Sequence, residues 1–226
     1  MSDQRRHRFA AILLDLDGTI LETLPDLAAA LNRLLVSQGR RTCSTAEIRA
    51  MIGDGVPTLI ERGFAATGED VDAQELSRLV NLFLPDYNAN ATVETHPNPG
   101  ALEFCRAEQA AGVKLAVVTN KPQAPSEIIL AATGFADLLS ATVGGDRAAA
   151  KKPDAAPITL ALELLGVAPG DAVMIGDSKA DVGAARAAGI PVAAYRHGYT
   201  SVPVDDLGAD LVFDDFADLP EALAGL

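Results

Sequence analysis

The stretch Ile12-Leu13-Leu14-Asp15-Leu16-Asp17-Gly18-Thr19 decides the fold class of this chain. It has the pattern of an apolar strand that ends in two aspartates, followed at once by a Gly-Thr turn. Because side chains alternate faces along a strand, we expect Asp15 and Asp17 to project from the same side at its carboxyl end. Open parallel sheets bind ligands beyond that end of their strands. Two carboxylates about 4 Å apart repel by on the order of 4 kcal/mol at an effective dielectric of roughly 20, so a compensating cation, shared proton or donor is expected.

Composition indicates a globular protein with a sizeable core. The chain has 226 residues, of which 49% are hydrophobic, so we expect one domain, or one domain with an insert. The formal net charge of −13 argues against nucleic acid or an anionic membrane as a partner. Cys43 and Cys105 match neither a disulfide framework nor a metal-binding spacing, which favours a reducing compartment and a cytoplasmic location.

The first residues superficially resemble a secretory signal, because Arg5-Arg6-His7-Arg8 precedes apolar residues. Asp15 and Asp17 end that apolar run too early for a signal peptide, so we expect a solvated arm. No segment of the sequence approaches the roughly 20 apolar residues that cross a bilayer, and we expect no membrane partner.

Short apolar runs recur along the chain and predict buried strands. They cover residues 10–15, 114–119, 141–143, 172–175, 192–195 and 209–213. Helical patterns occupy residues 99–111, 124–133, 156–165, 179–188 and 216–224. Strands that alternate with helices indicate an α/β fold with a doubly wound parallel sheet.

Residues from about 21 to 95 break this alternation. They predict consecutive amphipathic helices without a convincing strand, with boundaries that include Gly68 and Asp86, and a return hinge at residues 94–99. We therefore expect a catalytic core formed by residues 1–20 and 96–226, with residues 21–95 inserted as a small helical cap. An insert beside the aspartate-bearing strand end is well placed to act as a lid.

Polar signals also follow the second, third and fourth predicted strands. They are Thr119-Asn120, then Gly144-Gly145-Asp146 with Lys151-Lys152-Pro153, and Gly176-Asp177-Ser178 through Asp181 at a helix start. Taken singly, each has an ordinary explanation as a helix cap or a solvated loop. Parallel strands bring their carboxyl ends to one edge of the sheet, so we expect the four signals to form one site.

These four segments, in this order, resemble the motifs of the haloacid dehalogenase-like superfamily of phosphohydrolases, and the resemblance covers nearly the whole chain. It implies a Rossmann-like core and a mechanism through an aspartyl phosphate. Carried over, it makes Asp15 the nucleophile and Asp17 the general acid and base. Thr119 would bind the phosphoryl group, and Lys152 would steady both Asp15 and the phosphate.

The same resemblance implies Mg²⁺ as the cofactor. A phosphate dianion needs a hard cation before it approaches carboxylates, and Mg²⁺ takes few protein oxygens. The expected ligands are Asp15, Asp177 and Asp17, the last through its backbone carbonyl. Asp181 would coordinate through water or orient its neighbours.

Within the superfamily, the segment Met51–Arg62 is similar to the lid of bacterial phosphoglycolate phosphatases, as are Thr119-Asn120-Lys121 and Gly144-Gly145-Asp146. This implies hydrolysis of a small phosphomonoester, 2-phosphoglycolate, to glycolate and phosphate. One departure is Leu21-Glu22-Thr23, which stands where an Asp-Ser or Asp-Thr pair is common and places the longer Glu22 at the local lid contact.

Glycolate carries a carboxylate, so the lid is expected to offer a cation or backbone donors. Arg62 is the first candidate and Arg49 the second, although each could instead pair with Glu61 or Glu47 on the surface. With Thr119, the expected substrate-binding residues are Asn120, Arg62 and Gly55.

Other activities remain as alternatives. A phosphomutase of the beta-phosphoglucomutase kind, or a sugar-phosphate phosphatase, would share the lid and both aspartates. A non-enzymatic ligand-binding module is disfavoured by the intact motifs. Asp17 argues against a haloacid dehalogenase, and a phosphonatase needs a lid lysine, whereas the first lysine here is Lys114. The sequence leaves the oligomeric state open.

Overall fold

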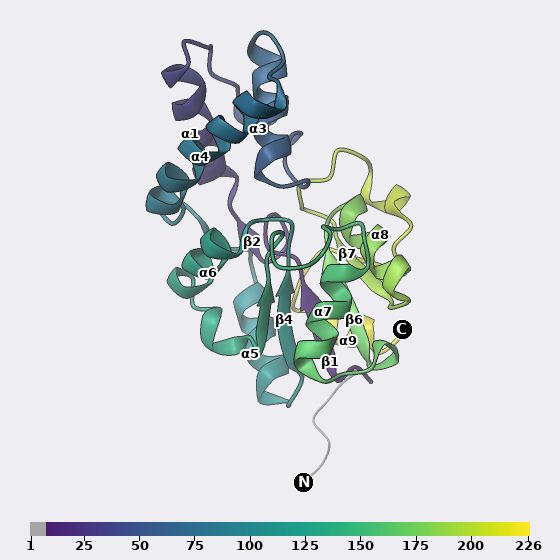
Figure 1. The fold of residues 1–226 in the computed structure, drawn as a ribbon. Coiled ribbons are helices and arrows are strands. Elements are labelled where there is room, and N and C mark those ends of the chain that lie inside the picture. The colour runs from purple at the N-terminus through teal and green to yellow at the C-terminus, as the bar shows by residue number, and fades with distance from the viewer. Residues whose placement is uncertain (1–7) are drawn as a thin grey trace.

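The computed structural model of the chain describes residues 8–226, so Arg5-Arg6-His7 of the expected N-terminal arm lies outside the described residues. Its centre is a parallel six-stranded sheet of order β5-β4-β1-β6-β7-β8 (Figure 1). The strands are β1 (Ala11–Leu14), β4 (Lys114–Val118), β5 (Ala141–Val143), β6 (Ala172–Gly176), β7 (Val192–Tyr195) and β8 (Leu211–Phe213).

Both faces of the sheet are buried by helices, which explains why the strands are continuously apolar. Leu13 belongs to the core that α7 and α8 form on one face. Its neighbours Ile12 and Leu14 belong to the core on the other face, which α5, α6 and α9 cover. The helices of the sheet region are α5 (Ala101–Ala110), α6 (Gln123–Ala132), α7 (Ala156–Leu165), α8 (Lys179–Ala188) and α9 (Leu219–Leu223), with 3₁₀ turns η1 (Ala136–Leu138), η2 (Pro169–Asp171) and η3 (Val204–Leu207).

The strand order places a topological switch point beside β1. After β1 the chain adds β4 and β5 on one side, then crosses to the other side for β6, β7 and β8. In register, Leu13 lies between Ala116 of β4 and Met174 of β6. Ligands of doubly wound sheets bind in the crevice beyond the strand ends at such a point. The predicted α/β fold with a doubly wound parallel sheet is confirmed.

Helices make up most of the segment between β1 and β4, and they lie beyond the carboxyl edge of the sheet (Figure 1). They are α1 (Leu24–Ser37), α2 (Thr45–Arg49), α3 (Val56–Thr67) and α4 (Ala73–Asn90). Local signals explain their starts: Ser44 and Glu47 form a reciprocal capping box at α2, and Asp72 caps α4.

Two local predictions for this segment were wrong. Leu21–Glu22 (β2) pairs antiparallel with His96–Pro97 (β3) at the base of the helices, where no strand was expected in residues 21–95. A two-residue strand is too short to show hydrophobic periodicity. This pair forms because the segment that leaves the sheet region for the helices and the segment that returns from them lie side by side. Asp86 does not end a helix, since α4 continues through Pro85 and Asp86 to Asn90. The Asp86 carboxylate instead forms an ion pair with Arg33 of α1, at 2.7 Å.

Within residues 8–226, none of the helices combines the length and the apolar character that a membrane crossing requires.

Candidate active site

A cavity of about 240 Å³ lies between the carboxyl edge of the sheet and the helical segment. Its wall on the sheet side carries aspartates and polar residues, and its opposite wall carries apolar side chains, a glycine-rich turn and the Asp54–Arg62 ion pair. The lining residues are Asp15, Asp17, Leu27, Ala50, Ile52, Gly53, Asp54, Gly55, Val56, Leu59, Arg62, Thr119, Asn120, Lys121, Asp177, Ser178, Lys179, Ala180, Tyr199, Thr200 and Ser201. The four sequence signals thus converge on one edge, three of them lining the cavity and Lys152 contacting one of its carboxylates.

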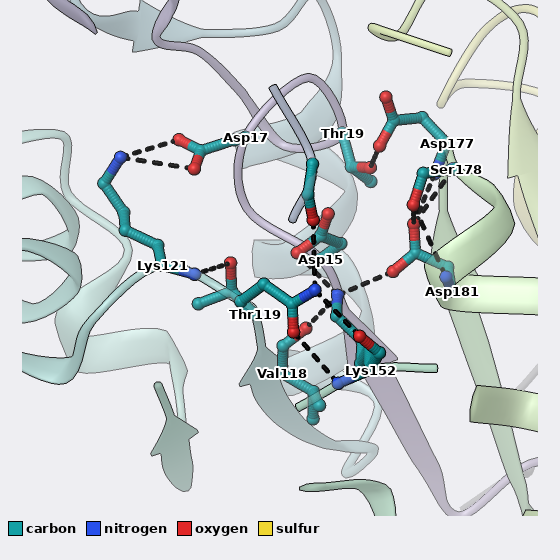
Figure 2. Close-up of polar contacts among 12 residues, drawn as sticks. Asp15, Asp17, Thr19, Val118, Thr119, Lys121, Lys152, Asp177, Ser178 and Asp181 are labelled. Atoms are coloured by element: carbon teal, nitrogen blue, oxygen red, sulfur yellow. Dashed lines mark hydrogen bonds and ion pairs between the residues drawn. The ribbon is translucent and has the colours of Figure 1, made fainter. Parts of the chain in front are cut away.

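Asp15 follows β1 directly, and its backbone N–H still bonds to Ile175 of β6 at 2.8 Å, so the sheet holds it firmly. Its carboxylate forms an ion pair with Lys152, whose Nζ lies 2.8 Å from Oδ1 (Figure 2). The same ammonium donates to Asp181 Oδ1 at 2.6 Å and to the Val118 carbonyl at 2.7 Å. Lys152 therefore has three acceptors around it, which fixes its position next to Asp15.

Asp17 has a different lysine as its partner. The chain turns at Leu16, and the Asp17 carboxylate reaches Lys121, whose Nζ lies 2.9 Å from Oδ1 and 3.2 Å from Oδ2 (Figure 2). Thr23 donates its hydroxyl to the same Oδ1 at 2.6 Å. The repulsion expected between the two aspartates is thus relieved by a separate buried ammonium for each.

Lys121 and Thr23 were not assigned to the site from the sequence. Lys121 was noticed only as part of the segment Thr119-Asn120-Lys121, and a lysine in a loop carries no signal of its partner. The pairing with Asp17 joins residues 104 positions apart, so only the folded chain reveals it.

Asp177 and Asp181 complete a buried acidic cluster with Asp15. One carboxylate oxygen of each lies within 4.8 Å of the others, an arrangement that could hold a metal ion. Thr19 donates to Asp177 Oδ1 at 3.0 Å. Asp181 is fully buried, and its Oδ2 accepts from the backbone N–H groups of Asp177 and Ser178 and from the Ser178 hydroxyl. With Lys152 on Oδ1, both carboxylate oxygens of Asp181 accept hydrogen bonds from neighbouring groups.

Burial raises the pKa values of two carboxylates in this cluster. It raises the pKa of Asp15 to about 6; the Asp181 charge adds to the rise, and the Lys152 ammonium opposes it. Burial, followed by the charges of Asp181 and Asp15, also raises the pKa of Asp177 well above its usual range. Burial lowers the pKa of Lys152, but the two carboxylates it contacts raise it by more, so the net pKa is above its ordinary value. The ammonium of Lys152 therefore does not fully compensate the negative charge of these buried carboxylates, as expected of a site that binds a cation.

Thr119 and Asn120 stand at the end of β4, as the sequence predicts. Thr119 is buried, and its hydroxyl accepts the backbone N–H of Lys121 at 3.2 Å. The Asn120 side chain forms two hydrogen bonds with the backbone of Lys152. Its Nδ2 donates to the Lys152 carbonyl at 3.0 Å, and its Oδ1 accepts the Lys152 backbone N–H at 2.9 Å. Its Nδ2 also donates to the Gly53 carbonyl at 3.0 Å. Asn120 thereby ties the lysine loop to the helical segment, and its amide is already engaged by backbone groups.

Gly55 brings the helical segment close to the sheet edge. Its φ of 90° and ψ of 173° are a conformation that is essentially restricted to glycine. A Cβ at this position would lie 2.9 Å from the Asn120 carbonyl oxygen and 2.9 Å from Lys151 Nζ. The backbone here approaches the core more closely than any side chain would allow.

Arg62 lines the cavity but pairs with Asp54, and its Nη1 donates to the Met51 carbonyl at 2.9 Å. Neither Glu61 nor Glu47 is its ion-pair partner; Glu47 pairs with Arg41 instead. Arg49 does not line the cavity. It donates to the carbonyls of the 197–198 turn at 3.2 and 3.0 Å. Of the two arginines, Arg62 is therefore the one whose position would allow contact with a ligand in the cavity.

Tyr199 is a further site residue that the sequence analysis missed. Its hydroxyl bonds to Glu22 and accepts the backbone N–H groups of Thr23 and Leu24 at 2.8 and 3.0 Å. Its own backbone N–H donates to the Asp177 carboxylate. The unusual Glu22 is thus bound to a residue that also contacts the acidic cluster.

Comparison with known proteins agrees with this geometry. Residues 12–195 match the family model of the haloacid dehalogenase-like hydrolases. The chain belongs to this family. The haloacid dehalogenase-like sequence is 42% identical over 221 residues to the phosphoglycolate phosphatase of Rhodospirillum rubrum, covering 94% of this chain and 90% of the relative. It is 41% identical over 213 residues to that of Caulobacter vibrioides, with the same coverage.

A solved structure resembles this haloacid dehalogenase-like fold over almost its full length. It is the crystal structure of a "predicted phosphoglycolate phosphatase" from Haemophilus somnus, with a TM-score of 0.88 and 32% sequence identity. The match covers 94% of this chain and 96% of the other. The resemblance found in the motifs therefore extends through the sheet and the helical segment.

Proposed function

We propose that this protein is a Mg²⁺-dependent phosphatase that hydrolyses 2-phosphoglycolate to glycolate and phosphate. The observation that carries the proposal is the pair of aspartates after β1, each with its own buried lysine, which line one small cavity together with Asp177. Asp181 lies buried beside them, in contact with Lys152. The names of the relatives from Rhodospirillum rubrum and Caulobacter vibrioides support the choice of substrate.

In the first half-reaction, a carboxylate oxygen of Asp15 attacks phosphorus and the bond from phosphorus to the glycolate oxygen breaks. Asp17 gives a proton to that departing oxygen, because an alkoxide is a poor leaving group. In the second, water attacks the aspartyl phosphate, Asp17 takes a proton from the water, and Asp15 is regenerated. Lys152 holds Asp15 in place and, with Thr119, would stabilise the charge on the phosphoryl oxygens.

The residues present fit a magnesium ion. Asp15 and Asp177 supply hard oxygen ligands with raised pKa values, and a backbone carbonyl such as that of Asp17 would add a third. Asp181 is engaged on both oxygens by Lys152, Ser178 and backbone donors, so we propose that it orients the site, with any contact to the ion through water. When bound, the ion would neutralise phosphate charge as it approaches the carboxylates.

We further propose that residues 21–95 act as a cap over a core formed by residues 1–20 and 96–226. Cap residues would bind the carboxylate end of the substrate, with Arg62 and the backbone at Gly55 as the candidates, since both line the cavity. Two free, buried cysteines, Cys43 and Cys105, suit action in a reducing cytoplasm.

Steady-state kinetics with Mg²⁺ on a panel of phosphate esters tests this function. The panel contains 2-phosphoglycolate, several sugar phosphates and an aryl phosphate, and we expect the highest kcat/KM for 2-phosphoglycolate. Asp15→Asn should abolish turnover of every ester with the fold unchanged by circular dichroism. Appreciable residual activity would refute Asp15 as the nucleophile. A preference for a sugar phosphate with transfer back to sugar would indicate the phosphomutase alternative.

A further inference from the structure

Lys121 is one of two fully buried lysines at the site, and the reaction outlined above gives it no role. Its side chain is 1% exposed, against 15% for its partner Asp17. A buried ammonium is costly unless it is paired, and its ion pair with Asp17 supplies that compensation. Lys152 serves the nucleophile in a separate set of contacts, so the two lysines have different partners.

The backbone of Lys121 is held rigidly in the loop after β4. Its N–H donates to the Thr119 hydroxyl at 3.2 Å, and its carbonyl accepts the N–H of Gly145 at 2.7 Å. The side chain also lies against α4, with Nζ 4.7 Å from the centre of the Tyr87 ring. Lys121 is thus fixed by the sheet at one end and by the helical segment at the other.

Asp17, in contrast, stands on a turn beyond the end of β1. Thr23 contacts only Oδ1 of its carboxylate, at 2.6 Å. A single contact leaves the carboxylate plane free to rotate, whereas Lys121 reaches both oxygens, at 2.9 and 3.2 Å. Proton transfer needs the two heavy atoms within about 2.6–3.2 Å, and a misplacement of about 1 Å can cost about 100-fold in rate.

We propose that Lys121 is a positioning residue that fixes the Asp17 carboxylate at the leaving-group side of the cavity. The inference rests on the proposed function, in which Asp17 exchanges a proton with the departing oxygen. Because Lys121 also packs on Tyr87 of α4, the helical segment helps to hold this arrangement.

The test compares three esters that separate the possible roles. 2-Phosphoglycolate has a poor leaving group and a carboxylate, ethyl phosphate has a poor leaving group without a carboxylate, and p-nitrophenyl phosphate has a good leaving group that needs little protonation. For Lys121→Met, we expect kcat to fall about 100-fold on both alkyl esters and less than about 3-fold on the aryl ester. Lys179→Met is the matched control, because Lys179 also lines the cavity but forms neither a hydrogen bond nor an ion pair with Asp17, and it should not change the alkyl-to-aryl ratio.

Two further variants keep the test decisive. Lys121→Gln retains a donor to Asp17, should show an intermediate ratio, and decides the question if Lys121→Met does not fold by circular dichroism. The double variant Lys121→Met with Asp17→Asn should match Asp17→Asn alone on ethyl phosphate, because a misplaced and a missing acid are equivalent.

Equal losses on alkyl and aryl esters would overturn the inference in favour of a purely structural role. A loss confined to 2-phosphoglycolate, seen as a raised KM, would overturn it in favour of binding to the substrate carboxylate. Either result could occur with an active wild-type enzyme and would leave the proposed function standing. A wild-type protein that hydrolyses none of the three esters would overturn both.

Discussion

Gly55 offers a sharp test of the proposed cap, because the structure separates two costs of adding one methyl group there. The first is conformational: φ 90° and ψ 173° cost a non-glycine residue roughly 1–3 kcal/mol wherever the cap lies. The second is a contact with the core. The new Cβ would lie 2.9 Å from the carbonyl oxygen of Asn120, whereas ordinary contacts begin at 3.4 Å.

The core cannot move away from the new methyl group without a cost in free energy. Lys151 is a flexible side chain that can move, but the Asn120 carbonyl is backbone, and its residue is held by hydrogen bonds to Lys152 on both its amide atoms. Forcing an extra methyl into a packed contact costs about 1–3 kcal/mol. This second cost applies only when the cap lies against the core.

Gly55→Ala should therefore raise KM for 2-phosphoglycolate by about 5-fold to about 140-fold, since about 1.4 kcal/mol corresponds to tenfold in affinity. Gly53→Ala is the control: Gly53 has φ 121°, and a Cβ there would meet nothing within 4 Å. Both variants should lose stability in urea unfolding, but only Gly55→Ala should raise KM. A KM within twofold of wild type for Gly55→Ala, with the expected loss of stability, would refute the reasoning that cap and core touch at this point during binding.

Four more predictions concern specificity, stability and reactivity. Arg62→Ala should raise KM for 2-phosphoglycolate and barely change KM for ethyl phosphate, measured by steady-state kinetics; equal changes would place the carboxylate contact elsewhere. Asp181→Asn removes the charge of one of the two buried carboxylates that pair with Lys152, so it should lower the free energy of unfolding by about 2–4 kcal/mol, measured in urea. Weaker repulsion on Asp15 and Asp177 should offset part of this loss, and an unchanged unfolding midpoint would contradict this role of Asp181. Burial, followed by the Glu108 charge, raises the pKa of the Cys105 thiol from 9.0 to about 12. Between these pH values the folded protein therefore binds more protons than the unfolded chain, so its free energy of unfolding should fall as pH rises from about 9. At pH 8 iodoacetamide should label Cys105 far more slowly in the native protein than in urea, and rapid native labelling would show that the thiol is accessible.

The helices and strands of the core were predictable because each carries its own local signal. Residues 156–165 and 179–188 form helices with the predicted bounds, since glycines at 166 and 189 end them in the left-handed conformation. The pair of β2 and β3 was missed because a two-residue strand depends on its partner across the chain. The helix boundary expected at Asp86 was wrong because packing of α4 on α1, with the Arg33–Asp86 ion pair, outweighs a local breaker at Pro85.

The residues of the candidate site also fall into those that local sequence signals predicted and those that only the folded chain revealed. Asp15, Asp17, Thr119 and Asp177 could be found from the sequence, because polar residues directly after apolar runs mark strand ends. Tyr199 could not, since its hydroxyl meets the backbone of Thr23 from 176 residues away. The engagement of Asn120 and Arg62 by neighbouring groups was equally beyond reach, because a motif shows which atoms are present and not which bonds they already make.

By itself, the sequence determined the order of strands and helices, the residues at the strand ends and hence the family, because these depend on periodicity and spacing along the chain. Only the tertiary structure decided how charge is shared at the site, with Lys152 on Asp15 and Asp181, and Lys121 on Asp17. The physical reason is that an ion pair depends on distance and burial in space, and loops distant in sequence set both.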